Sequence, residues 1–147
     1  MAEDVYRTIE APAEAACRER SSKFLSYIYP VCTEEEIRER LEAFVAALVE
    51  AHPDKPLIFM QTHWHAAGNF NNEAAQFHRE RIATADRMMR RLAKQYDNVY
   101  FLDGEWYYGK DSEGTIDCDH GSDLGFDRMI RERLPHIRKI LRKYGIR

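Results

Sequence analysis

The segment His52-Pro53-Asp54-Lys55-Pro56-Leu57-Ile58-Phe59-Met60-Gln61 decides the fold of this chain. Its prolines end the preceding helix, because proline lacks the amide hydrogen that a helix interior needs. The largely apolar run Leu57–Gln61 then predicts a short strand of the buried, parallel kind. A second such run, Val99–Leu102, follows a helical segment. Two buried strands joined by a helix predict a parallel β-α-β unit.

Helical periodicity predicts three helices around these strands. Thr33 and Glu36 form a capping box for the first helix, which continues to about residue 51. The second helix is expected to begin after Asn71 or Asn72. The third is expected to be capped by Asp123, and Pro135 should bend or break it.

Two more strands are predicted near the N-terminus, at Val5–Glu10 and Lys23–Val31, from β-branched and aromatic residues. The connection between them, Ala11–Ser22, is long and charged, so no tight hairpin is expected. The element order is then β-β-α-β-α-β-α. We expect an α/β fold in one domain, residues 1–147, with a small three-layer mixed sheet. Three of its strands would be parallel, and the N-terminal strand would be an antiparallel edge strand.

Composition limits the classes of partner and compartment. A net charge of −3 in 147 residues gives no general attraction to nucleic acid. The last helix is basic. Its basic residues could form a solvated face or a contact surface for a partner, and the sequence leaves both interpretations open. Three cysteines without metal-ligand spacing indicate free thiols in a reducing compartment. Neither a signal peptide nor a membrane span is apparent, so we expect a cytoplasmic protein without a membrane partner.

The run from Gly114 to Phe126 carries the clearest chemical signal. It contains Asp117-Cys118-Asp119-His120 just before the last helix. A carboxylate three residues before a histidine can orient the imidazole and leave its other nitrogen free as a general base. A general base needs a nucleophile to activate, and no serine on a glycine-rich elbow is evident. From the motif alone, an ordinary polar loop is the alternative.

The loops after Gln61 and Leu102 should meet at the carboxyl ends of the parallel strands, where ligands bind in open sheets. They would bring His63, Trp64 and His65 to the same rim as the Asp117/His120 turn. With His78, these histidines are possible metal ligands, but structural zinc sites usually show tighter spacing or cysteines. We therefore expect rim histidines, no metal and no cofactor. The neighbouring aromatic residues are expected to pack rather than to stack a ligand.

The C-terminal part of the chain, about residues 44–141, resembles an SGNH/GDSL-type ester hydrolase. The resembling segments are His52–Met60, Asn98–Leu102 and Gly114–Phe126. The resemblance implies that Asp117 is the orienting acid and His120 the catalytic base. The family's Gly-Asp-Ser block with the nucleophile, and its oxyanion-stabilising glycine and asparagine, have no counterparts in place. Gly68-Asn69 is only superficially similar to the asparagine block.

The N-terminal part, about residues 4–44, resembles the opening of an IMPACT-type domain. The resembling segments are Tyr6–Pro12, Arg20–Tyr27, Pro30–Val31 and Thr33–Ile37. This resemblance implies a link to translation, with possible RNA or ribosome contact. Together the two resemblances indicate a chimera of an IMPACT-like segment, 1–44, and a hydrolase-like part, 45–147, with the seam in the first helix.

Two functions follow, and the sequence leaves open whether the chain is an enzyme. The first is an incomplete SGNH-type ester hydrolase that keeps Asp117 and His120 but is weakly active or inactive towards a small ester. The second is a non-catalytic binding module, linked to translation or RNA, that uses the basic last helix or the strand-end rim. Because so small a sheet leaves apolar helix surface uncovered, we also expect a homodimer.

Overall fold

The computed structural model describes residues 9–31, 33–104 and 106–146. The chain divides into two compact units, residues 1–41 and 42–147. The boundary falls inside helix α1, Glu34–Ala51, which is continuous across it. No helix in the described part of the chain is long and apolar enough to cross a membrane. The expectation of one domain stays a prediction.

The first unit contains an antiparallel hairpin formed by strands β1, Ala13–Glu19, and β2, Ser22–Ile28. The register pairs Ala13 with Ile28 and Glu19 with Ser22, so the turn is tight. The prediction of a long connection at 11–22 was therefore wrong. Alanine and glutamate are poor strand formers, but pairing with the aromatic and β-branched β2 overrides that preference. Most of the predicted strand Val5–Glu10 lies outside the described residues.

The start of α1 confirms the predicted capping box. The Glu36 amide donates to Thr33 Oγ1 at 3.2 Å, and the Thr33 amide donates to Glu36 Oε2 at 3.2 Å. Two otherwise unpaired amides are thereby satisfied, which fixes where the helix begins.

The second unit is built on two parallel strands, β3, Leu57–Met60, and β4, Val99–Leu102. Their register pairs Leu57 with Val99 and Met60 with Leu102, which confirms the predicted parallel neighbours. The strands are less buried than predicted, since only Val99 is fully buried and Met60 is exposed. The cause is geometric: each strand of a two-stranded sheet has a free edge.

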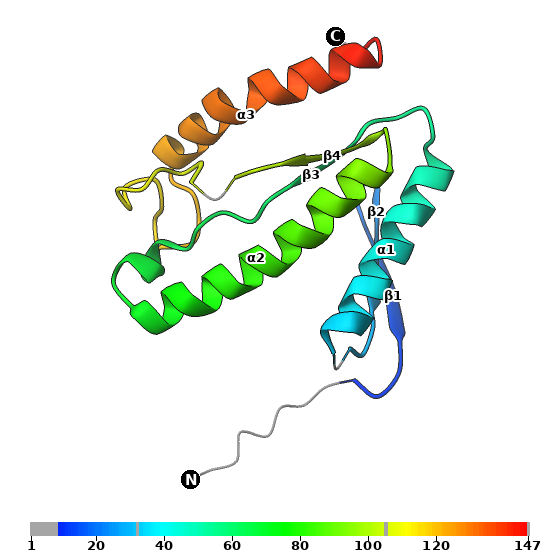
Figure 1. The fold of residues 1–147 in the computed structure, drawn as a ribbon, viewed down its shortest axis with the longest axis horizontal. Helices are drawn as coiled ribbons and strands as arrows, with labels where there is room; N and C mark the ends of the chain where they lie inside the picture. Colours follow the sequence, from blue (N-terminus) through cyan, green and yellow to red (C-terminus); the bar gives the residue numbers. More distant parts are fainter. Residues whose placement is uncertain (1–8, 32, 105, 147) are drawn as a thin grey trace. The chain divides into compact units, whose positions relative to one another are not determined.

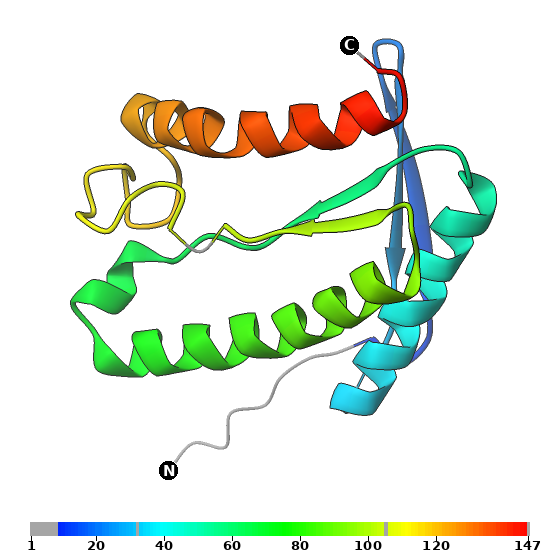
Figure 2. The ribbon, with the colours of Figure 1, turned by 45° about the horizontal axis from the view of Figure 1, so that its top comes forward.

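Helix α2, Asn72–Gln95, lies on one side of this strand pair and helix α3, Asp123–Lys143, on the other (Figure 1, Figure 2). The result is a helix–sheet–helix arrangement, as expected of an α/β fold. Leu92 of α2 and Ile140 of α3 are buried. Pro135 does not break α3, which continues for eight residues beyond it to Lys143. Proline removes one helical hydrogen bond, and the remaining bonds and the packing of α3 outweigh that loss.

The predicted four-stranded mixed sheet was wrong for the described residues. The strands form two separate two-stranded sheets, β1-β2 and β3-β4. The right-handed crossover rule, from which three parallel strands were predicted, applies only to strands that share a sheet. The rule cannot show whether β2 and β3 belong to the same sheet.

Candidate active site

The Asp117/His120 turn lies in the loop between β4 and α3 and is closed on itself. Thr115 and Gly121 form an antiparallel bridge, and the Ile116 amide donates to the His120 carbonyl at 2.8 Å. Cys118, between the two site residues, has a left-handed φ of 70°. This backbone bend places the amides of residues 119 and 120 near the Asp117 carboxylate.

Close packing against Tyr108 explains the glycines on either side of the turn. A Cβ at Gly121 would come within 2.9 Å of Tyr108 Cζ, and one at Gly114 would overlap the Tyr108 carbonyl oxygen. A Cβ at Gly125 would in turn overlap the Gly114 carbonyl oxygen. The loop therefore approaches α3 through positions that only glycine can fill.

The helix that follows is capped by Ser122, so the prediction that Asp123 caps it was wrong. The Ser122 side chain accepts a hydrogen bond from the Gly125 amide at 3.2 Å. It also donates to the Glu113 carbonyl at 3.2 Å. A hydroxyl can do both, whereas an ionised carboxylate only accepts. This serine therefore ties the loop to the first turn of α3.

Asp117 and His120 form the predicted hydrogen-bonded pair. His120 Nδ1 and Asp117 Oδ2 are 2.7 Å apart. Asp117 Oδ1 accepts the His120 amide at 2.7 Å and the Asp119 amide at 3.1 Å. With Nδ1 donating to the carboxylate, Nε2 is the nitrogen left to accept a proton. The His120 side chain is 77% exposed, so a reactant can reach it.

The electrostatics of the turn follow from these bonds. The backbone amide and then the side chain of His120 lower the pKa of Asp117 to about 2. The bond from Asp117, its charge and the charge of Asp119 raise the pKa of His120. A carboxylate that stays ionised beside the imidazole favours its protonated form, which is the state a general base reaches after accepting a proton.

None of the hydrogen bonds among the described residues joins a serine or threonine hydroxyl to the His120 side chain. The absence of a nucleophile from this chain stays a prediction. Asn69, in the segment that superficially resembles the asparagine block, is engaged elsewhere. Its carbonyl oxygen accepts the Trp64 indole at 2.9 Å, and its amide donates to Ser112 Oγ at 2.7 Å.

The loop after β3 reaches the same rim, as predicted. The Ala66 amide donates to the Cys118 carbonyl at 2.7 Å. His63 Nε2 lies 3.1 Å from Asp119 Oδ1, and His65 Nδ1 lies 2.9 Å from the same oxygen. Sequence reasoning missed Asp119 as the residue that joins the two loops. Asp119 lies between Asp117 and His120, and this turn was predicted to share a rim with His63 and His65. Those two facts could have identified it.

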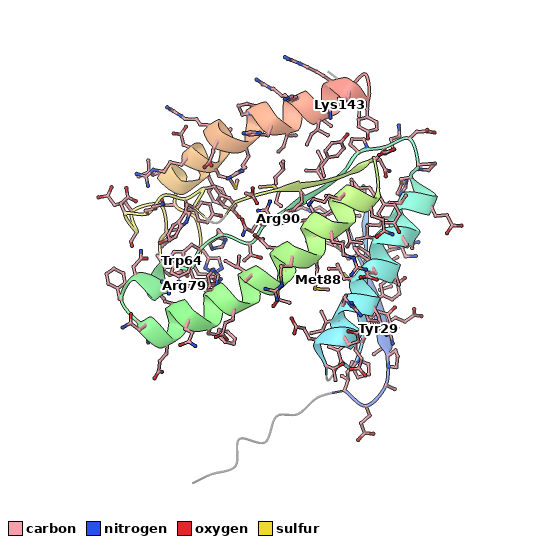
Figure 3. All side chains as sticks on the ribbon, in the orientation of Figure 1. Tyr29, Trp64, Arg79, Met88, Arg90 and Lys143 are labelled. Carbon is pink, nitrogen blue, oxygen red and sulfur yellow. The ribbon has the colours of Figure 1, made fainter. Side chains whose placement is uncertain are left out.

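The aromatic residues of the rim mostly pack, as expected. Trp64 and Tyr107 are buried, and the rings of Trp64 and Trp106 are 5.1 Å apart. Figure 3 shows Arg79 beside Trp64, with its guanidinium 5.6 Å from the ring centroid. These contacts form a scaffold under the loop rather than an open stacking surface.

The basic helix α3 holds part of its charge in pairs with carboxylates. Arg128 forms a two-pronged pair with Asp111, at 2.7 and 2.8 Å, and also donates to the Tyr108 carbonyl. The Arg128 guanidinium lowers the pKa of Asp111 to about 2. Arg131 pairs with Asp127 and Arg133 with Glu132. Ion pairs of this kind are common on solvated helices, and the choice between a solvated face and a contact surface for a partner stays a prediction.

The parallel α/β unit and the Asp-x-x-His turn before its last helix are similar to those of GDSL-type proteins. The chain belongs to the GDSL-like lipase/acylhydrolase family, whose model matches residues 13–138. The match begins within β1 and extends past residue 44, so one family covers both sides of the predicted seam. No comparison supports an IMPACT-type segment or a chimera.

Among solved structures, the chain is similar to a protein from Bacteroides ovatus described as a "putative GDSL-like lipase". The two share 39% sequence identity with a TM-score of 0.62. The similarity covers 77% of this chain but only 34% of that one, so the chain corresponds to about a third of its relative. A search of curated proteins returns no match.

Proposed function

We propose that this chain supplies the acid–base part of an ester hydrolase, with Asp117 orienting His120 as the general base. The observation that carries the proposal is the 2.7 Å contact between Asp117 Oδ2 and His120 Nδ1, with the imidazole exposed. Family membership supports ester hydrolysis as the type of reaction.

In the proposed reaction, His120 Nε2 accepts the proton of a serine hydroxyl as that oxygen attacks the ester carbonyl carbon. The protonated imidazole then donates the proton to the leaving alkoxide, and a water molecule repeats the sequence to release the acid. Asp117 stays ionised and stabilises the imidazolium throughout. No Gly-Asp-Ser block is present in the 147 residues, so the serine would come from outside them, and the chain alone is an incomplete, weakly active or inactive hydrolase.

The first experiment measures hydrolysis of a short-chain p-nitrophenyl ester by the purified chain and by His120→Ala. We expect no difference between the two rates, because the base has no nucleophile to activate. A rate that depends on His120 would show that a nucleophile is present within the chain, and would overturn its proposed absence.

A second experiment tests the base itself. A hybrid joins this chain to the two thirds of the Bacteroides ovatus protein that it does not cover. We expect esterase activity that falls by about 10²–10⁴-fold in His120→Ala, the usual range for a general base. His136→Ala, which changes an exposed histidine of α3, is the matched control and should retain activity. A folded, active hybrid that tolerates His120→Ala would refute the assignment.

The binding-module alternative gains no specific support from the structure. The basic surface of α3 is partly neutralised by ion pairs of its arginines. Nothing in the comparisons links the chain to translation. Cytoplasmic location likewise stays a prediction.

A further inference from the structure

Two histidines and a carboxylate converge beside the proposed active site in a way that ester hydrolysis does not require. The nitrogen or oxygen donor atoms of His63, His65 and Asp119 all lie within 4.8 Å of one another. The three side chains are 18%, 36% and 43% exposed, so they are partly shielded yet accessible from solvent.

The separations suit a small divalent ion. Zinc binds imidazole nitrogen and carboxylate oxygen at about 2.0–2.2 Å in tetrahedral geometry, which places neighbouring donors roughly 3.3 Å apart. His63 Nε2 and His65 Nδ1 lie 3.1 and 2.9 Å from Asp119 Oδ1. Small side-chain movements would therefore bring all three atoms to bonding distance of one ion.

A backbone hydrogen bond, a buried histidine and a ring stack hold this arrangement in place. The Ala66 amide bonds to the Cys118 carbonyl at 2.7 Å, which fixes the histidine segment against the turn that carries Asp119. Buried His78 lies behind the segment, with its Nε2 3.0 Å from the His63 carbonyl oxygen. The rings of His63 and His65 are stacked, 5.2 Å apart at 16°. Donors held in this way lose little freedom when they bind a ligand.

We propose that His63 Nε2, His65 Nδ1 and Asp119 Oδ1 bind one divalent transition-metal ion of the zinc class. Imidazole donors favour zinc, cobalt or nickel over magnesium and calcium, which prefer oxygen. Three protein donors leave a further position for water. The bound ion cross-links the loop after β3 to the turn before α3, across 54 to 56 residues of sequence.

The test uses the whole chain, stripped of metal with a chelator, and zinc chloride titrated calorimetrically at pH 7.5. We expect saturable binding of one ion per chain and no comparable binding of magnesium. His63→Gln, His65→Gln and Asp119→Asn should each weaken zinc binding at least about tenfold. The matched controls His136→Gln and Asp54→Asn change exposed residues and should bind as the unaltered chain does.

Cobalt provides a second measurement that needs no variant to fold. In the unaltered chain, Co²⁺ should give the visible absorption of a low-coordinate nitrogen and oxygen site without a thiolate charge-transfer band. A thiolate band would place a cysteine among the ligands and overturn the proposed set. Absence of saturable zinc binding, or equal binding by folded Asp119→Asn, would leave only a hydrogen-bonded junction between the loops and refute the site.

Discussion

At the level of single residues, both oxygens of Asp117 accept hydrogen bonds, and the pair with His120 sets the charge of the turn. His120 has a raised pKa, so its contribution to stability is present below its ordinary value of 6.5 and is lost as pH rises through the folded value. Asp117 has a lowered pKa, so its contribution is present above 3.8 and is lost as pH falls towards about 2. The pair therefore stabilises the turn most between pH 3.8 and 6.5.

The corresponding prediction concerns the titration of His120 in metal-free protein. Its pKa, followed by NMR of the imidazole, should lie above 6.5 and should fall in Asp117→Asn, because the carboxylate charge is lost. Ser26→Ala, at an exposed position of β2, is the control and should leave the His120 pKa unchanged. A His120 pKa that does not respond to Asp117→Asn would show that the pair is not formed in solution.

A second prediction at this scale concerns the cap of α3. Ser122→Ala removes the hydroxyl that accepts the Gly125 amide, so the free energy of unfolding should fall by about 1 kcal/mol. The measurement is denaturant unfolding followed by circular dichroism. Ser26→Ala, at an exposed position of β2, is the control and should change stability by less than about 0.5 kcal/mol.

At the level of elements, the packing of the turn against α3 depends on one close approach between the backbones of Gly114 and Gly125. Gly125 in the first turn of α3 lies directly against the Gly114 carbonyl, and there is no space for a side chain. Tyr108 packs beside both, so neither backbone can move away without disturbing the aromatic cluster. The position of His120 thus depends on how α3 docks against its own preceding loop.

We therefore predict that Gly125→Ala destabilises the chain by about 3 kcal/mol, the cost of forcing atoms into a packed site. Denaturant unfolding measures the loss. Gly145→Ala is a useful control, because a Cβ there meets nothing within 4 Å and only its φ of 71° is unfavourable. That control should cost about 1 kcal/mol. Equal losses at the two positions would contradict the steric explanation.

At the level of the whole molecule, the exposed apolar side chains of α3 bear on assembly. Leu124, Phe126 and Ile130 are 42%, 47% and 52% exposed. Residues 126 and 130 are four apart and so lie on one helix face. An apolar stripe of this kind is commonly covered by a second copy in a symmetric dimer.

The predicted homodimer should have twice the chain mass of 17.3 kDa when measured by light scattering at micromolar concentration. Ile130→Glu should convert it to a monomer, because it places a charge in the apolar contact. Ile116→Glu changes an isoleucine that is 78% exposed in the turn, and should leave the dimer intact. A monomeric unaltered chain would refute the dimer.

The sequence by itself determined the features that depend on neighbouring residues. The Thr33/Glu36 capping box, the parallel pair of β3 and β4, and the Asp117/His120 contact were all predicted correctly. The capping box and the Asp117/His120 contact each join residues three apart. The strand pair consists of two apolar runs that one helix connects. Such local geometry leaves few alternatives, because backbone sterics and hydrogen bonding restrict it.

Tertiary structure alone decided the rest. The alanine- and glutamate-rich β1 forms a strand only because β2 pairs with it, and nothing local predicts that β2 and β3 lie in separate sheets. Asp119 meets His63 and His65 across more than fifty residues. Contacts of this kind depend on how whole elements pack, and the energy of that packing is spread over many side chains. No short stretch of sequence contributes enough of this packing energy to predict such a contact by itself.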